Sequence, residues 1–312
     1  MSRSERKVIV ITRQTRADEL IRRFNTLAQA EFYVTSRGGD FSDYQEESVR
    51  YKAAVAASCQ VIENLARMQR LDREYVPAYI FGPDDIVVVI GQDGLVANTV
   101  KYLHGQPLIA VNPDPARYDG VLLPFVAADV KPVLLAVLAG RFSVTEVTMA
   151  QASLGDGQSM LAVNDFFIGR TTHVSARYSL QVGKMAENQS SSGIIVSTGL
   201  GRTGWLKSVV TGASAVAAAL GADPVGDPIP SGSSQWGSDT LYYSVREPFP
   251  SRVTGTSLVF GQVSKAQTLQ VTSQMPENGV IFSDGVEDDF LRFTSGVTAR
   301  ISIAGDKGQL VT

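Results

Sequence analysis

Short, purely apolar runs alternate with segments of helical periodicity through the first part of the chain. Residues 8–11 form an apolar run typical of a buried strand, and apolar side chains recur every three or four residues over 16–27, which predicts a helix. A second helix is predicted over 47–68, and β-rich runs follow at 75–81 and 86–90. The last run, IVVVI, lacks polar alternation, so it indicates a strand covered on both faces, as in a parallel α/β sheet.

The tetrapeptide GQDG, residues 91–94, directly follows this strand. Helical periodicity over 95–103 and the strand-like sequence PLIAVN at 107–112 complete a predicted βαβ unit. A further helix is predicted over 129–138. In open α/β sheets, ligands bind at the carboxyl ends of the strands, so the glycine turn lies where a ligand is expected.

A different pattern begins near Arg141, where polar and apolar residues alternate between frequent Gly, Ser and Pro. This alternation predicts a mostly antiparallel β domain, interrupted by one helix over 205–220 and a long glycine- and proline-rich loop over 221–238. We therefore expect an α/β domain with a Rossmann-like parallel sheet at 1–141 and a β-rich domain at 142–312. The alternating segments are TEVTMAQASL, HVSARYSLQVG, DTLYYSVREP, SLVFGQV, TLQVTSQM, GVIFSDG and FLRFTSG.

Length and composition agree with two folded domains. The 312 residues exceed the usual size of one domain, and 44% are hydrophobic against 19% charged, which excludes a mainly disordered chain. The 28 Lys and Arg against 31 Asp and Glu leave a net charge of −3 without a long basic run, so no nucleic-acid partner is expected. Neither a membrane span nor a leader sequence is indicated, so we expect a soluble, cytoplasmic protein without a membrane partner.

Side chains for metal or nucleophilic chemistry are few. Cys59 is the single cysteine and lies in a predicted helix, where a small core residue is the expected role. His104 and His173 are the two histidines, which excludes an HExxH zinc site and leaves few bases for a serine triad. No resident metal ligands are therefore predicted.

The sequence GLGRTG at 199–204 satisfies the GxGxxG pattern of dinucleotide-binding folds, after the predicted strand GIIVS and before a predicted helix. A Rossmann oxidoreductase needs a second parallel strand after that helix, ending in an acidic residue that binds the ribose. Here the helix leads into the loop at 221–238 instead. The Rossmann interpretation is therefore only a minor alternative.

The turn at 91–94 has the features of a phosphate site. Gly91 and Gly94 allow close approach of the backbone, and free N–H groups open the following helix. Asp93 adds a carboxylate where an anion-binding turn normally avoids one. It could coordinate magnesium indirectly or accept a proton from a hydroxyl that attacks the phosphate. The alternative is an aspartate that only tightens a turn.

Five short motifs follow one another along the chain: GQDG at Gly91, PLIAVNPDP at Pro107, ND at Asn164, STGLGRTGW at Ser197 and SDG at Ser283. Their order and spacing resemble the NAD kinase family, in which the elements are GGDG, a strand ending in Asn, an NE pair, STPTGSTAY and a late DG. The resemblance covers about residues 85 to 290. VNPDPARYDG and YSVREPF look most similar to the branch with the mitochondrial NAD kinases of animals and related bacterial proteins.

This resemblance implies two domains with an active site between them, where ATP, with magnesium, phosphorylates the 2′-hydroxyl of the adenosine ribose of NAD to give NADP. It also implies a homodimer or homotetramer. Carried over by position, Asp93 would orient or deprotonate that hydroxyl. The other family positions would bind the substrates: Gly91 and Gly94 the phosphates, Asn164 and Asp165 the adenosine portion of NAD, Thr203, Gly204, Trp205 and Ser208 the dinucleotide pocket, and Asp284 its edge.

Several positions depart from the family pattern. Gln92 replaces a glycine and is expected to restrict the turn, Asp165 replaces Glu, and Ser192 replaces an Asp of the pocket. These changes keep open a kinase for another hydroxyl, on a sugar, nucleoside or lipid, and a nucleotide-binding protein without turnover.

The binding residues also have structural interpretations. Asn164 and Asp165 could form a turn, and Trp205 could be a core residue. In favour of binding, Asn can donate and accept at an adenine edge, and Asp can accept from both hydroxyls of a ribose.

Overall fold

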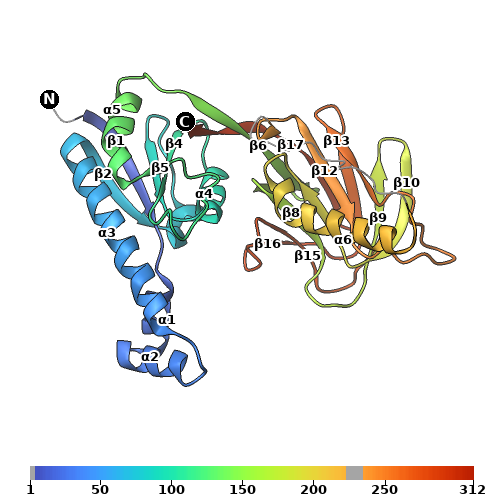
Figure 1. The fold of residues 1–312 in the computed structure, drawn as a ribbon. Coiled ribbons are helices and arrows are strands. Elements are labelled where there is room, and N and C mark those ends of the chain that lie inside the picture. Colours follow the sequence, from blue (N-terminus) through green and yellow to red (C-terminus); the bar gives the residue numbers. More distant parts are fainter. Residues whose placement is uncertain (1–3, 223–234) are drawn as a thin grey trace. The chain divides into compact units, whose positions relative to one another are not determined.

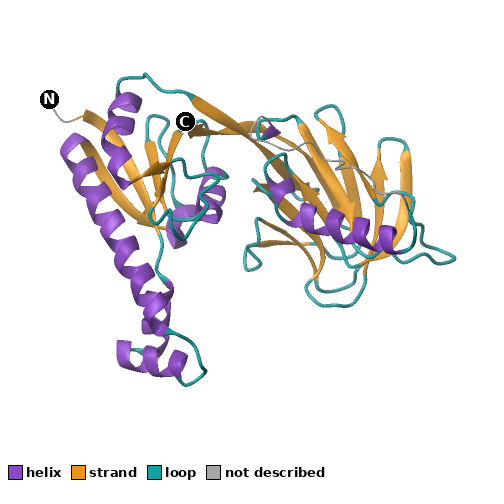
Figure 2. Ribbon diagram, viewed as in Figure 1, coloured by secondary structure: helices purple, strands orange, loops and turns teal. Residues whose placement is uncertain are grey.

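The computed structural model describes residues 4–222 and 235–312 (Figure 1). The chain folds into two compact units. The first unit comprises Met1–Thr145 with Gln309–Thr312, and the second comprises Glu146–Gly308. Helices and a parallel sheet make up the first unit, whereas strands dominate the second (Figure 2).

A parallel sheet forms the centre of the first unit. Its strands lie in the order β2, β1, β3, β4, with β5 beside β4, and all of these pairs are parallel. The end of the chain joins this sheet, because Gln309 and Leu310 pair in parallel with Pro107 and Leu108. The strands are β1 (Ser4–Thr12), β2 (Ala66–Asp72), β3 (Ile86–Ile90), β4 (Pro107–Asn112), β5 (Phe125–Val126) and β17 (Thr298–Val311).

Two helices of the first unit, α3 and α5, pack on the sheet. Ile62 of α3 and Leu134 of α5 share a buried cluster with Val8 and Val88 of the strands. The start of α3 packs against α1 and α2 around a separate small cluster that includes Phe41. None of the described helices is both long and apolar enough to span a membrane. The helices are α1 (Arg16–Phe24), α2 (Leu27–Thr35), α3 (Phe41–Leu65), α4 (Asp93–Val100) and α5 (Val130–Leu138), with 3₁₀ turns η1 (Arg73–Ala78) and η2 (Ala127–Asp129).

The βαβ unit predicted around GQDG is confirmed. Strands β3 and β4 are parallel neighbours, and α4 connects them. All five residues of β3 are buried, as the uninterrupted apolar run predicted. The turn at 91–94 therefore lies at the carboxyl end of a strand.

The predicted helix over 16–27 is wrong in its extent, because it is two helices. Asn25 adopts a left-handed conformation with φ of 68° and ends α1. Thr26 then caps α2, since its side chain accepts a hydrogen bond from the N–H of Gln29. Leu27 belongs to the second helix and is 47% exposed.

The segment around α3 also differs from the prediction. The helix begins at Phe41 instead of 47, after an Asp40 cap, and ends at Leu65 instead of 68. Residues 66–72 form β2, which pairs in parallel with β1. This edge strand buries few side chains and therefore has no apolar run. The predicted β-rich run at 75–81 is also wrong, because η1 occupies most of it.

Two antiparallel sheets form the second unit. One has the order β13, β12, β11, β8, β15, β16, and the other contains β10, β9, β14 and β17, with β6 paired to β17 and β7. Ile168 and Val196 of the first sheet share a buried cluster with Leu180 and Val271 of the second, as in a sandwich. The strands are β6 (Val144–Leu154), β7 (Ser159–Ala162), β8 (Asp165–Arg170), β9 (Ala176–Val182), β10 (Met185–Ser191), β11 (Ile194–Ser197), β12 (Thr240–Val245), β13 (Phe260–Ser264), β14 (Leu269–Ser273), β15 (Gly279–Ser283) and β16 (Phe290–Arg292).

One helix, α6 (Trp205–Ala219), follows the 3₁₀ turn η3 (Gly201–Thr203) in the second unit, as the helical pattern over 205–220 predicted. Most of the predicted loop over 221–238 lies outside the described residues. The predicted fold class, a parallel α/β region followed by a mostly antiparallel β region, is confirmed.

Candidate functional site

Three segments of the second unit meet at one pocket: the turn between β7 and β8, the loop after β11, and the residues after β15. The pocket has a volume of about 330 Å³, near the lower end for small-molecule sites. It brings together most of the residues that the resemblance assigned to the dinucleotide, whereas Ser208, further along α6, is exposed and outside the lining. The lining residues are Asn164, Asp165, Leu200, Gly201, Thr203, Gly204, Trp205, Asp284 and Gly285.

The motif STGLGRTGW holds the turn that carries Asn164. The N–H of Thr198 donates to the carbonyl of Asn164 at 2.9 Å, and its hydroxyl donates to the carbonyl of Val163 at 2.6 Å. The same hydroxyl accepts the N–H groups of Leu200 and Gly201. Thr198 therefore ties the loop after β11 to the turn before β8.

Gly201 is required by close packing against this turn. A Cβ at this position would lie 2.0 Å from the carbonyl oxygen of Asn164, a backbone atom that cannot move aside cheaply. The strand before the motif, β11, is antiparallel to both of its neighbours, β8 and β12. The GLGRTG sequence therefore does not start a Rossmann βαβ unit, and its third residue serves turn packing.

Asp284 is bonded to the same turn. Its carboxylate accepts the N–H of Asn164 at 2.6 Å, that of Val163 at 3.1 Å and that of Asp165 at 3.3 Å. Its own N–H donates to the carbonyl of Asp165 at 3.0 Å. The motif SDG thus closes the pocket from the β15 side.

Asp165 is the buried ionisable group of the pocket. It is 8% exposed, and its carboxylate has no hydrogen-bond donor among the described residues. Burial in this position, followed by the nearby charge of Asp284, raises its pKa to about 7. A carboxylate in such surroundings has its full hydrogen-bonding capacity available to a ligand.

Trp205 lies between the core and the candidate pocket. Its ring stacks on Phe167 with centroids 5.8 Å apart and planes 11° apart, against a cluster that includes Ile195 and Val280. The guanidinium of Arg246 lies 5.3 Å from the ring centroid. Trp205 is half-buried and also lines the pocket, so it packs on the core and faces the candidate site.

The GQDG turn belongs to the first unit. Gln92 caps α4 with φ of −113° and ψ of 165°, an extended conformation open to any residue, so the loss of a glycine introduces no backbone strain there. Asp93 is the first residue of α4, and its Oδ1 accepts the N–H of Leu122 at 2.6 Å. Gly94 is exposed, and a Cβ there would meet nothing within 4 Å. The first unit's own packing therefore does not require glycine at this position.

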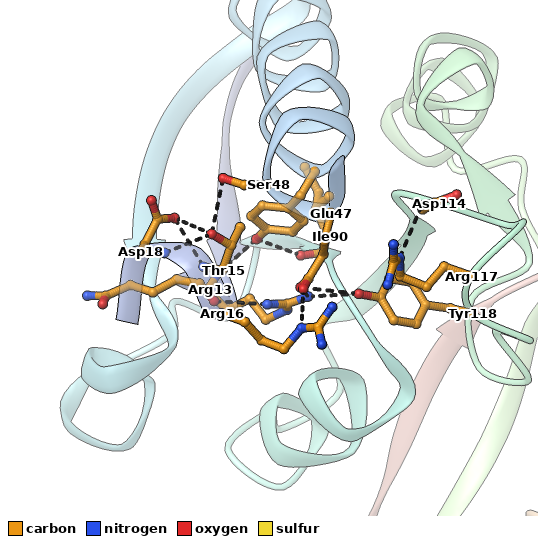
Figure 3. Close-up of polar contacts among 12 residues, drawn as sticks. Arg13, Thr15, Arg16, Asp18, Glu47, Ser48, Ile90, Asp114, Arg117 and Tyr118 are labelled. Carbon is orange, nitrogen blue, oxygen red and sulfur yellow. Dashed lines mark hydrogen bonds and ion pairs between the residues drawn. The ribbon is translucent and has the colours of Figure 1, made fainter. Parts of the chain in front are cut away.

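A buried ionic network lies near the carboxyl ends of strands β1 and β3, and no sequence motif indicated it (Figure 3). Glu47 of α3 is 3% exposed, and its carboxylate accepts from the guanidinium groups of Arg13 and Arg16 and, at 3.3 Å, from the hydroxyl of Tyr118. Burial alone would raise the pKa of Glu47, but the hydrogen bonds and charges of the two arginines lower it overall. Glu47 directly follows Glu46 in a helical pattern, and nothing in the sequence distinguishes the two glutamates.

This network reaches the residue that precedes the GQDG turn. The hydroxyl of Tyr51 accepts the N–H of Arg13 at 2.8 Å and donates to the carbonyl of Ile90 at 3.1 Å. The ends of β1 and β3 are therefore fixed to α3.

Part of this chain is similar in sequence to known proteins. No family model matches the sequence. An NAD kinase of Heliobacterium modesticaldum is 32% identical over 129 residues, which are 39% of this chain and 44% of that protein. An NAD kinase of Burkholderia multivorans is 31% identical over 138 residues, 41% of this chain and 45% of that protein. The matches thus span less than half of the length of these curated relatives.

Solved structures extend the similarity to nearly the whole fold. Yeast NADH kinase complexed with NADH has a TM-score of 0.59 at 15% identity, covering 99% of this chain and 84% of that one. The chain is similar to NAD kinases over part of its sequence. An NAD kinase from Archaeoglobus fulgidus in complex with ATP has a TM-score of 0.55, also at 15% identity, covering 98% of this chain and 93% of that one. The solved structures thus confirm the fold that the NAD kinase resemblance implied, and the partial sequence matches agree with that resemblance.

Proposed function

We propose that this chain is an NAD kinase, which transfers the γ-phosphoryl group of ATP to the 2′-hydroxyl of the adenosine ribose of NAD and releases NADP and ADP. The observation that carries the proposal is the buried carboxylate of Asp165, which lines a pocket without an internal hydrogen-bond donor among the described residues. Buried polar groups are normally paired, so a ligand with hydroxyl donors is the natural partner. A ribose supplies two such hydroxyls on adjacent carbons.

The neighbours of Asp165 fit the rest of an adenosine. Asn164 lines the same pocket, and its amide can both donate to and accept from the edge of an adenine ring. Trp205 offers an aromatic wall on which a base or ribose can pack. Thr203 and Gly204, both exposed at the start of α6, complete the rim. Ser208 is exposed and outside the pocket lining, so it would contact a part of NAD that extends beyond the pocket.

The GQDG turn is the proposed site of phosphoryl transfer. The open space at Gly94 and the N–H groups that begin α4 suit the phosphates of ATP, with Gly91 at the entry to the turn. Asp93 is the proposed proton acceptor for the attacking hydroxyl. The N–H of Leu122 holds one of its carboxylate oxygens, which leaves the other oxygen for the hydroxyl.

Magnesium enters this proposal as part of the ATP substrate. Within the described ranges, no three His, Cys, Asp or Glu side chains come together as a metal site. Magnesium is commonly held by phosphate oxygens and water with few carboxylates, so the ATP phosphates would supply its ligands, and Asp93 would reach it only through water. Assembly into a homodimer or homotetramer and residence in the cytoplasm remain predictions.

NADH is the second candidate acceptor, because the yeast structural neighbour is an NADH kinase complexed with NADH. NAD and NADH share the adenosine ribose and differ only at the nicotinamide ring. A pocket that recognises the adenosine end through Asn164 and Asp165 would accept both.

An acceptor screen tests the proposal. The purified chain would be incubated with ATP, magnesium and one candidate at a time from NAD, NADH, nucleosides, sugars and lipids, and products would be identified by mass spectrometry. We expect phosphorylation of NAD or NADH on the adenosine ribose. Phosphorylation of another class alone would replace the acceptor in this proposal, and ATP binding without any phosphorylated product would indicate a nucleotide-binding protein without turnover.

Asp93→Asn is the matched catalytic test. Because a positioned proton acceptor contributes about 100- to 10,000-fold to rate, we expect turnover to fall within that range while ATP affinity is retained. Asp119→Asn, in the loop that follows β4, serves as the control. Unchanged turnover in folded Asp93→Asn protein would remove this carboxylate from the mechanism.

A further inference from the structure

The residue after β15 has an unusual backbone conformation. Asp284 has φ of 55°, in the left-handed region that disfavours residues other than glycine, and Gly285 follows with φ of 73°. A residue kept in a strained backbone conformation needs a compensating interaction, and such residues often cluster at functional sites. The compensating interaction here is made by the carboxylate of Asp284.

That carboxylate lies where three consecutive backbone N–H groups converge. The donors belong to Val163, Asn164 and Asp165, at 3.1, 2.6 and 3.3 Å from Oδ1. Successive N–H groups of this kind form a concave anion site, which Asp284 fills from within the chain. The oxygens are thus engaged with the backbone of the turn.

The turn between β7 and β8 needs this partner. Val163 is fully buried, and a buried N–H without an acceptor is unfavourable. Thr198 holds the carbonyl groups of Val163 and Asn164 from the other side. The loop after β15 therefore binds the N–H groups of the turn, and the loop after β11 binds its carbonyl groups. Together they fix the backbone that carries the side chains of Asn164 and Asp165.

Asp284 also sets the electrostatic surroundings of Asp165. Of the described residues that line the pocket, only these two have ionisable side chains. The charge of Asp284 acts together with burial to disfavour the ionised form of Asp165. A residue that acts only by filling space would not have this effect.

We propose that Asp284 is a positioning residue of the candidate acceptor pocket, which holds Asn164 and Asp165 for contact with a ribose and does not itself touch the ligand. This inference rests on the proposed function for the identity of the ligand. The sequence resemblance placed Asp284 at the edge of the dinucleotide pocket. In this proposal Asp284 instead holds the backbone that positions the binding residues.

Two measurements on Asp284→Asn test the proposal. The first is a titration of the Asp165 carboxyl carbon by NMR in the ligand-free protein, with its signal assigned from its loss in Asp165→Asn. We expect the midpoint to fall because the neighbouring charge is gone, while burial keeps it above the ordinary aspartate value. The second is NAD affinity by calorimetry, which we expect to fall about tenfold while ATP affinity stays unchanged. Asp289→Asn, an exposed carboxylate in the same loop, should change neither.

Asp284→Gly provides a second variant in case the amide disturbs folding, because glycine adopts the left-handed conformation without strain. It should shift the Asp165 titration in the same direction and alter the amide signals of residues 163–165. An unchanged midpoint and unchanged amide signals in both variants would overturn the proposal. Loss of NAD affinity with an unshifted Asp165 would also overturn it, because Asp284 would then contact the ligand directly. The NMR titration needs no NAD, so it tests the role of Asp284 by itself. Failure of the proposed function would show separately, as an absence of NAD binding to the wild-type protein.

Discussion

Each unit of this chain contains a deeply buried carboxylate, and the two carboxylates have opposite surroundings. Glu47, in the first unit, is 3% exposed and paired with two arginines and a tyrosine, and these partners lower its pKa. Asp165, in the second unit, is 8% exposed, and burial and a second carboxylate raise its pKa to about 7. The hydrogen-bonding capacity of Glu47 is used inside the fold, whereas no described residue donates a hydrogen bond to the carboxylate of Asp165. Burial alone therefore does not separate a structural carboxylate from a candidate binding residue, but the hydrogen-bond partners do.

The largest expected effect concerns stability in the first unit. Glu47→Gln removes one partner of a buried ion pair and leaves the side chain of Arg13 without its counter-charge, which typically costs about 3 to 5 kcal/mol. Urea unfolding would measure this loss, and NAD affinity of the folded protein should not change. The neighbouring Glu46→Gln is the control, because Glu46 is largely exposed and its contact with Arg50 spans 3.8 Å, so its effect should stay within about 0.5 kcal/mol. Equal effects of the two substitutions would break the comparison.

Replacing Asp165 should stabilise the fold, whereas replacing Glu47 should destabilise it. Between about pH 4 and pH 7 the folded chain holds a proton at Asp165 that the unfolded chain has released, so wild-type stability falls as pH rises through this window. Asp165→Asn removes this loss and should be more stable than wild type at pH 8, by up to about 4 kcal/mol, since about three pH units separate the two pKa values. The gain should shrink towards zero as pH falls to about 4. Denaturant unfolding over this pH series measures it, and a destabilised variant at pH 8 would place Asp165 in the same class as Glu47.

Trp205 sharpens the comparison, because it packs on Phe167 and also lines the pocket. If Trp205 contacts the ligand, Trp205→Ala should weaken NAD binding about five- to 150-fold, the equivalent of about 1 to 3 kcal/mol for a stacked base, with little change for ATP. Trp236→Ala removes the other tryptophan of the second unit and controls for the loss of an indole ring. Loss of thermal stability with unchanged NAD affinity would instead make Trp205 a core residue.

Local patterns were sufficient to predict the central elements of the first unit. The run IVVVI, the glycine turn after it and the strand PLIAVN each contain their own signal, and all three occur as expected. Strand β2 was missed because an edge strand of sequence ARMQRLD has no apolar run. The break at Asn25 was missed because the helical periodicity continues through it and only the backbone conformation interrupts it.

The candidate site was predictable as a set of residues but not as a set of contacts. Motif order brought Asn164, Asp165, Trp205 and Asp284 to attention, and the structure gathers them at one pocket. The hydrogen bonds of Asp284 span about 120 residues of sequence, and the clash that excludes a side chain at Gly201 depends on a distant carbonyl. No local pattern contains such information. For the same reason the pairing of Glu47 with Arg13 could not be predicted.

The central claim is that Asp165 makes the pocket of the second unit a binding site for NAD. Calorimetric titration of NAD into wild type and Asp165→Asn at pH 8, with ATP as the reference ligand, tests it most directly. We predict measurable NAD binding by wild type at millimolar NAD or below, weakened roughly five- to 150-fold in Asp165→Asn through loss of about 1 to 3 kcal/mol, with equal ATP affinity in both proteins. Absence of NAD binding to folded wild type, or equal NAD affinity in the two proteins, would contradict the claim.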